Sequence, residues 1–186
     1  MPVASTPLSD TSVAAGDPAA WRQHCLALLA RPSRFATIPD LMTIALRAFT
    51  EGLGVSECWV ALYNARDRQL MITASAGFPA EQRLVGQRLG DSRNTAPGDW
   101  LGSAARHDMD AAAQVRYASL LPATLRSISR ERVYHLLPLL LNGHLLGLVY
   151  ICSGPQRPLL DDKRATALIR TVDCLLKALE AFKTKA

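Results

Sequence analysis

Arginine and aromatic residues gather in the segment 77–132, and together they suit an anionic ligand. A guanidinium group presents a planar fork of donors that matches a phosphate or a carboxylate, and an aromatic ring can stack on a base. The candidate ligand-binding residues, in this segment and just after it, are Arg93, Trp100, His107, Arg116, Tyr117 and His135. They suggest a small anionic, nucleotide-like effector. The simpler alternative, which we rank ahead of it, is a solvated surface whose arginines are balanced by Asp91, Asp99, Asp108 and Asp110.

Catalytic chemistry finds little support in the sequence. The cysteines, Cys25, Cys58, Cys152 and Cys174, are scattered in a pattern that fits neither a disulfide framework nor a zinc site. The sequence has no context for a Ser–His–Asp triad, no phosphate-cradling glycine-rich loop before a helix and no metal-ligand spacing. We therefore expect a protein without catalytic residues.

A regular apolar seam runs along the last part of the chain. Apolar residues recur there at alternating steps of three and four, at Ala165, Leu168, Val172, Leu175, Leu179 and Phe182. This spacing is typical of a helix that meets another helix. We expect a homodimer interface formed by Leu168, Val172, Leu175, Leu179 and Phe182. The alternative is that the helix packs its apolar face on the chain's own sheet.

Composition limits the class of protein. The chain has 186 residues, of which 49% are hydrophobic, and a formal net charge of +5. This length suits one domain, and so small a charge excess, spread along the chain, indicates no nucleic-acid partner. No apolar run approaches the ~18 residues of a membrane span, and residues 1–16 do not resemble a secretory signal. We expect a cytoplasmic protein with a flexible leader at 1–17 and one domain at 18–186.

The order of expected elements is that of an α+β domain with an antiparallel sheet. Hydrophobic periodicity, capping residues and turn residues predict helices at 18–30, 39–54 and 159–182 and paired strands at 56–63 with 69–75 and at 133–141 with 144–152. Asn142 and Gly143 join the second pair, in a dipeptide that favours a tight hairpin turn. Between the pairs we expect a short strand near 83–89 and helical pieces from Asp99 and Ala111.

The second strand pair resembles the penultimate hairpin of GAF domains. Members of that family commonly show a proline after a hydrophobic strand, a tight polar turn and a glycine inside an apolar strand, and Pro138, Asn142-Gly143 and Gly147 match this pattern. Residues 41–54 and 58–63 are similar to the family's entry helix and first strand, so the resemblance covers about 35–182. It implies a central antiparallel sheet with the N- and C-terminal helices on one face and variable helices or loops on the other.

The resemblance also implies a sensor or regulatory domain in bacterial signal transduction, linked to another signalling domain or protein. A finer similarity is to the GAF-like regions attached to bacterial HDOD proteins. GAF ligands include cyclic nucleotides, haem, bilins and other metabolites, yet the Asn-Lys-Phe-Asp-Glu string typical of cyclic-nucleotide binders is absent. Cys58 and Cys152 lie in apolar strands, where a bilin would not reach them, and His107 and His135 are the nearest candidates for haem. The cofactor therefore stays unknown.

Two other functions remain open. The first is a degenerate GAF domain that only dimerises or binds proteins. The second, which we rank last, is a thiol-based reductase like the GAF enzymes that reduce free methionine sulfoxide. Those enzymes use cysteines in loops over the pocket, and the segment 77–132 contains none.

Overall fold

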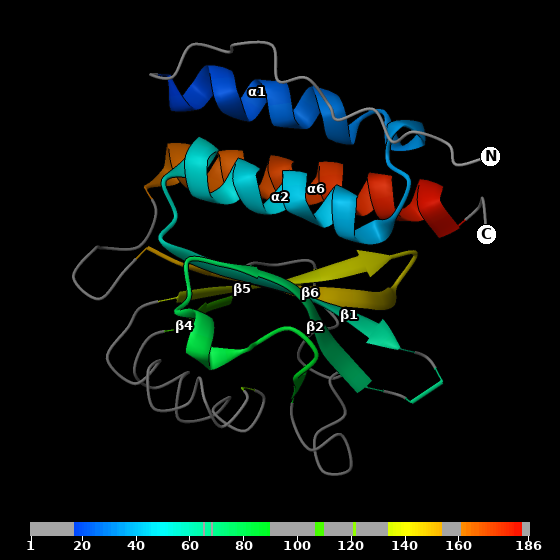
Figure 1. The fold of residues 1–186 in the computed structure, drawn as a ribbon. Coiled ribbons are helices and arrows are strands. Elements are labelled where there is room, and N and C mark those ends of the chain that lie inside the picture. Colours follow the sequence, from blue (N-terminus) through cyan, green and yellow to red (C-terminus); the bar gives the residue numbers. More distant parts are fainter. Residues whose placement is uncertain are drawn as a thin grey trace, which may run out of the picture.

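The computed structural model describes residues 17–64, 66–67, 69–89, 107–109, 121, 134–153 and 161–183. The expected leader and the helical pieces expected from Asp99 and Ala111 lie outside these residues. The elements along the chain are α1 (Pro18–Leu29), η1 (Pro32–Arg34), α2 (Ile38–Leu53), β1 (Glu57–Asn64), β2 (Gln69–Ala76), η2 (Ala80–Gln82), β3 (Arg88–Leu89), β4 (His107–Met109), β5 (Tyr134–Leu141), β6 (His144–Cys152) and α6 (Asp162–Lys183) (Figure 1).

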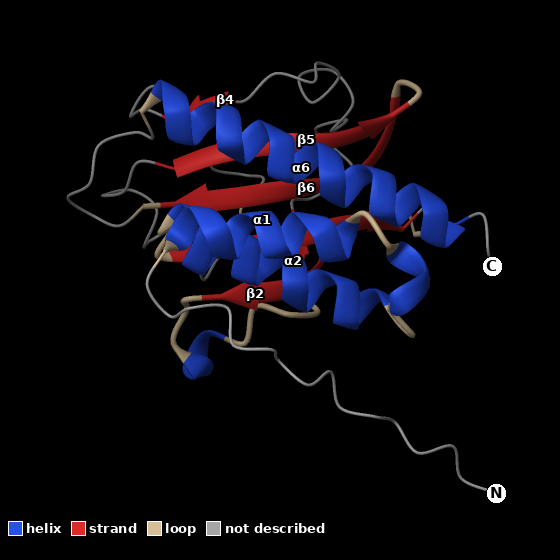
Figure 2. Cartoon of the chain, turned by 90° about the horizontal axis from the view of Figure 1, so that it is seen from above, coloured by secondary structure: helices blue, strands red, loops and turns tan. Residues whose placement is uncertain are grey.

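The strands form one antiparallel sheet in the order β3-β2-β1-β6-β5-β4. Figure 1 shows α2 and α6 lying against one face of this sheet, with α1 on the outer side of both, and Figure 2 shows the same helices from above. The α+β fold with N- and C-terminal helices on one face is therefore confirmed. We call this side of the sheet the helix face and the opposite side the far face.

The helix boundaries follow from local capping chemistry. The Asp17 carboxylate accepts a hydrogen bond from the backbone N–H of Ala19 at 2.8 Å, as the Asp-Pro sequence predicts. Helix α2 begins one residue before Pro39, because Thr37 and Asp40 form a capping box. It ends at Gly54, which takes a left-handed conformation with φ of 63°.

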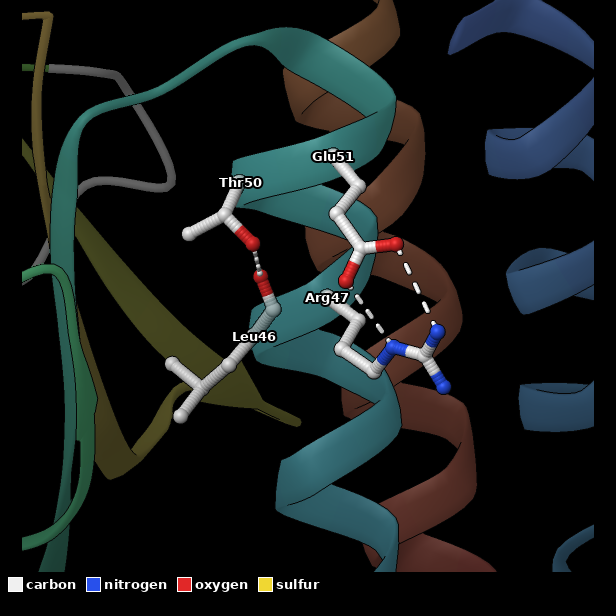
Figure 3. Close-up of polar contacts among 4 residues, drawn as sticks. All are labelled: Leu46, Arg47, Thr50 and Glu51. Carbon is white, nitrogen blue, oxygen red and sulfur yellow. Dashed lines mark hydrogen bonds and ion pairs between the residues drawn. The ribbon is translucent and has the colours of Figure 1, made fainter. Parts of the chain in front are cut away.

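The outer surface of α2 is held by short-range polar contacts. Arg47 donates to the Glu51 carboxylate one turn later, with an Nε–Oε1 distance of 3.0 Å, and the Thr50 hydroxyl donates to the Leu46 carbonyl (Figure 3). The same Arg47 guanidinium lies 4.4 Å from the centre of the Trp21 ring on α1. This cation–π contact links α1 to α2.

Strand β1 is covered on both faces, as its two-sided apolar pattern predicts. Cys58 and Val60 belong to the core under α2 and α6, whereas Trp59 and Ala61 belong to a second core on the far face. Strand β6 alternates in the same way, with Val149 on the helix face. The two central strands therefore anchor both cores.

Bulges change which residues share a face. A simple alternation places Leu70, Ile72 and Ala74 of β2 together, but the register shifts between Val60 and Ala61 of β1, so that prediction is wrong. Leu70 and Ile72 join the far-face core, and Ala74 packs on the helix side. The extra residue in β2 is Thr73, whose hydroxyl donates to the Val60 carbonyl at 3.1 Å.

The hairpin of β5 and β6 forms as expected. Asn142 and Gly143 both have positive φ, 51° and 78°, which is the geometry of the favoured two-residue turn. Pro138 pairs with Leu148, and the register shifts one residue further on, between Leu139 and Leu140. The strand expected at 83–89 is shorter than predicted and covers only Arg88–Leu89, because η2 and the left-handed residue Arg83 occupy the preceding chain.

Gly147 is required by the close approach of β6 to β1. A Cβ atom at Gly147 would lie 2.4 Å from the Ala61 carbonyl oxygen. We expect Gly147→Ala to lower the free energy of unfolding by about 3 kcal/mol, because neither backbone can yield without breaking the central pairing. Urea denaturation followed by circular dichroism measures this change.

The matched control is Gly86→Ala, where no heavy atom lies within 4 Å of the new methyl group. Its φ of 89° still disfavours a side chain, so we expect a cost of about 1–2 kcal/mol. Equal costs for the two variants would contradict the close-approach argument.

Candidate functional site

Four aromatic rings gather on the far face of the sheet, and we call Trp59, Phe78, Tyr134 and Tyr150 the aromatic cluster. The Trp59 and Tyr150 rings stack with centroids 5.2 Å apart and planes 7° from parallel. Tyr134 lies 4.9 Å from Tyr150, and Phe78 lies 6.2 Å from it on the other side. The strand register explains the grouping, since Trp59 of β1 pairs with Tyr150 of β6.

The cluster contains an unpaired donor. Trp59, Tyr134 and Tyr150 are all fully buried, yet among the described residues the indole Nε1 of Trp59 has no hydrogen-bond partner. A buried donor without an acceptor costs about 1–3 kcal/mol. This orphaned N–H is therefore a specific polar feature of the site, beside the two phenol hydroxyls.

The hydroxyl groups of the cluster stay protonated at ordinary pH. Burial raises the pKa of Tyr134 to about 12. Burial also raises the pKa of Tyr150 well above its usual value, and the nearby Cys152 and Glu57 raise it further. The phenols are therefore neutral donors and acceptors rather than anions.

Most of the sequence-predicted ligand residues stay predictions. Arg93, Trp100, Arg116 and Tyr117 lie outside the described residues. His107 belongs to β4, where its backbone pairs with Leu136.

His135 is directed away from the aromatic cluster. It pairs with Ile151, which is a residue of the helix-face core, and paired residues in a sheet share a face. The side chain of His135 is therefore on the helix face, where it is 2% exposed. The alternation of β5 directs Tyr134 and Leu136 to the far face instead, so a ligand role for His135 stays a prediction and would need a site on the helix face.

The cysteines are separated by the sheet itself. All four are free, and Cys58 belongs to the helix-face core whereas Cys152 belongs to the far-face core. Burial raises the pKa of the Cys58 thiol to about 12. Cys58 and Cys152 therefore lie on opposite faces of the sheet, and the Cys58 thiol stays protonated at ordinary pH.

The apolar seam of α6 packs within the chain. Leu168, Val172, Leu175 and Leu179 are buried in the helix-face core, and Phe182 packs against the same core. The side chains assigned to a dimer interface are thus already covered by the sheet and by α2, as in the alternative considered from the sequence. The physical reason is that apolar residues spaced alternately three and four apart form one face of a helix. That spacing is the same whether the face packs on a sheet or on a partner helix. A dimer through α6 would need another face of the helix.

Sequence reasoning missed the aromatic cluster. Trp59 and Tyr150 fall within the predicted strands 56–63 and 144–152, whereas the sequence-predicted ligand residues lie in or just after 77–132. The signal was present, because both residues fall on the same side of two strands that the turn residues and apolar runs had already predicted.

Within the described residues, no three His, Cys, Asp or Glu side chains gather closely enough to hold a metal ion. No helix in the same part of the chain is long and apolar enough to cross a membrane.

Comparisons with known proteins identify the fold. No protein-family model matches the sequence, and no curated protein matches it either. Solved structures match well. The GAF domain of the phosphoenolpyruvate-protein phosphotransferase from Acinetobacter superposes with a TM-score of 0.65 at 15% identity, over 89% of this chain and 96% of that one. The corresponding domain from Coxiella burnetii gives 0.66 at 13% identity, over 90% and 97% of the two chains.

A third similar structure carries a ligand. The phycoerythrobilin-bound GAF domain of a cyanobacterial phytochrome superposes with a TM-score of 0.62 at 16% identity, over 85% of this chain and 94% of that one. The chain therefore has the GAF fold, as its hairpin and entry helix indicate. The finer resemblance to GAF-like regions of HDOD proteins stays a prediction.

The pKa of Cys58 gives a test of its burial in the helix-face core. At about pH 8 a thiol with a pKa near 12 is ionised in roughly one molecule in ten thousand, so we expect iodoacetamide to leave Cys58 unmodified in the folded protein. Half-buried Cys174 should react faster and serves as the internal control. Mass spectrometry of peptides from folded and urea-unfolded protein measures both. Modification of Cys58 at the rate seen in urea would contradict the assignment.

Proposed function

We propose that this chain is a non-enzymatic sensor domain of signal transduction, working in the cytoplasm, which binds a small effector on the far face of its sheet. The observation that carries the proposal is the unpaired indole N–H of Trp59, buried within the aromatic cluster. An effector that offers a hydrogen-bond acceptor there would remove the cost of the orphaned donor. The phycoerythrobilin-bound relative supports the proposal, since it has the same fold and holds a conjugated ligand.

The chemistry of the far face favours a flat ligand with acceptor atoms. The stacked pair of Trp59 and Tyr150 presents ring faces, and neutral phenols supply O–H groups. Aromatic rings of a ligand bind such surfaces by offset or edge contacts. Arg93, Trp100, Arg116 and Tyr117 stay candidates for an anionic group on the effector, and His107 is a further candidate from β4.

Signal transfer would run through the two central strands. Strands β1 and β6 carry Trp59 and Tyr150 on the far face and Val60 and Val149 on the helix face. An effector changes the equilibrium between two arrangements of the helices only to the extent that its affinity for the two arrangements differs. A shift of either strand would displace α2 and α6 as well, because the core between the strands and these helices is closely packed. The domain would pass the signal to another signalling domain or protein.

A catalytic role has less support. The thiol mechanism open to GAF enzymes needs reactive, neighbouring cysteines, whereas Cys58 is buried with a pKa near 12. This supports a binding role for the chain.

Replacement of the indole tests the proposal. We expect Trp59→Phe to weaken effector binding about ten-fold, because one hydrogen bond of about 1.4 kcal/mol is lost while the ring packing is kept. Native mass spectrometry of freshly purified protein, with an absorbance scan, gives the retained molecule and its occupancy, and calorimetry then gives the affinity.

The control is Trp21→Phe. The Trp21 indole N–H is likewise buried without a partner, but it lies on α1, where its ring packs on Arg47. We expect this variant to retain the effector like the natural protein. Equal loss in both variants, or equal retention, would contradict a role for Trp59.

The second candidate function is an interaction module that dimerises and binds no effector. It is favoured by the aromatic cluster being fully packed, and by Ile169, which is 47% exposed on α6. A large apolar side chain exposed on a helix can contact a partner. In this version the dimer would use the Ile169 side of α6 rather than the buried seam.

A charge at Ile169 tests that alternative. We expect Ile169→Glu to shift a dimer to monomer in sedimentation velocity runs, since a carboxylate is costly to bury in an apolar contact. The matched control is Val85→Glu, an exposed apolar residue far from α6 in sequence and 58% exposed. A dimer that survives in both variants would rule out the Ile169 side as the interface.

A further inference from the structure

A groove between α1 and α6, on the opposite side of the sheet from the aromatic cluster, is lined by three cations. It encloses about 330 Å³, and its walls include Arg22, Gln23, Leu26, Lys163, Ala167 and Arg170. A second hollow of about 520 Å³ continues from it toward the end of α2 and shares Arg22 and Lys163. A volume of this size is typical of sites for small molecules.

The groove cations are unpaired. Among the described residues no carboxylate forms an ion pair with Arg22, Lys163 or Arg170. Arg164, at the edge of the second hollow, does have hydrogen-bond partners. Its guanidinium donates to the backbone carbonyls of Leu53 and Gly54 at the end of α2. Positive side chains that converge on one hollow without partners repel one another and favour a negative guest.

The helix directions add to the positive potential. The first turns of α1 and α6 lie together, because Arg22 of α1 and Lys163 of α6 line both hollows, and Figure 1 shows the two helices starting at the same end of the molecule. Helix N-termini carry partial positive charge. Two nearby carboxylates accept hydrogen bonds from backbone N–H groups. Asp17 caps α1, and Asp161 accepts from the Arg164 N–H. Asp162 is exposed in the first turn of α6.

The groove combines this charge with an apolar floor. Leu26 and Ala167 lie between the cations, and no acidic residue lines the 330 Å³ groove. A ligand that fills it must therefore carry an anionic head for Arg22, Lys163 and Arg170 and an apolar body for the floor.

We infer that the groove between α1 and α6 is a second ligand site, which binds a small phosphate monoester with an apolar body. The phosphate accepts charge-assisted hydrogen bonds from Arg22, Lys163 and Arg170, and the apolar body covers Leu26 and Ala167. This site is independent of the proposed effector site on the far face.

Phenyl phosphate is the probe that tests the inference. We expect it to shift amide resonances of residues on both α1 and α6 in two-dimensional NMR spectra of the full chain. Inorganic phosphate should bind more weakly because it lacks the apolar body, and benzyl alcohol should not bind because it lacks the charge. Binding should weaken as salt is raised.

The variant is Lys163→Gln combined with Arg170→Gln, at two exposed positions where loss of charge leaves the core intact. We expect it to weaken phenyl phosphate at least about ten-fold. The matched control is Lys177→Gln, which removes one exposed charge of the same helix outside the groove and should leave the affinity unchanged. Thermal melting verifies that both proteins are folded.

Several results would overturn the inference. They include no saturable binding of phenyl phosphate, resonance shifts that lie away from α1 and α6, and an equal loss of affinity in Lys177→Gln. An acidic peptide that binds the groove when phenyl phosphate does not would also overturn it, in favour of a protein partner. Because Trp59 is remote from the groove, Trp59→Phe should leave phenyl phosphate binding unchanged, so the two proposals fail separately.

Discussion

The pairing of β1 with β6 is the constraint on which the rest of the molecule depends. The two strands are antiparallel, with Glu57 opposite Cys152 at one end and Leu62 opposite Gly147 at the other. Both are covered on two sides, so each residue of this ladder is held by backbone bonds and by one of two cores. A slip of one residue would exchange the faces of Trp59 and Val60 and disrupt both cores at once. This is why a glycine stands where β6 comes closest to the Ala61 carbonyl.

The two cores differ in kind, and the difference matters for function. The helix-face core is largely aliphatic, so it can be packed tightly by α2 and α6. The far-face core contains rings that carry N–H and O–H groups. Aromatic side chains contribute large apolar area together with a polar handle, and a polar handle without a partner costs stability. The far-face core holds the unpaired Trp59 N–H among aromatic rings, which is why we place the proposed effector there.

The sequence predicts local structure well and the facing of side chains poorly. Asn142 and Gly143, the Asp17 cap and the two-sided strands are local features whose chemistry decides their structure. The face on which Ala74 lies depends on a bulge at Thr73, which the alternation of apolar residues does not predict. The face on which His135 lies depends on the register of β5 against β6. The burial of the α6 seam within the chain could not be predicted for a different reason, because the spacing of an apolar stripe does not show whether a sheet or a partner helix covers it. The groove could not be predicted at all, since Arg22 and Lys163 come from opposite ends of the chain.

The first helix is the element most open to control by a ligand. Only Cys25 and Leu29 of α1 are buried, whereas α2 buries eight residues, Leu41, Met42, Ala45, Leu46, Ala48, Phe49, Gly52 and Leu53. An element with few buried contacts opens at low free energy. Its attachment depends on the Trp21–Arg47 contact and on the close approach of Arg22 to Gly52. A ligand that joins Arg22 on α1 to Lys163 and Arg170 on α6 binds only the docked arrangement, so it stabilises that arrangement by mass action. Of the three described α-helices, the one with the fewest buried residues thus borders the groove cations, and such a ligand would set the position of α1.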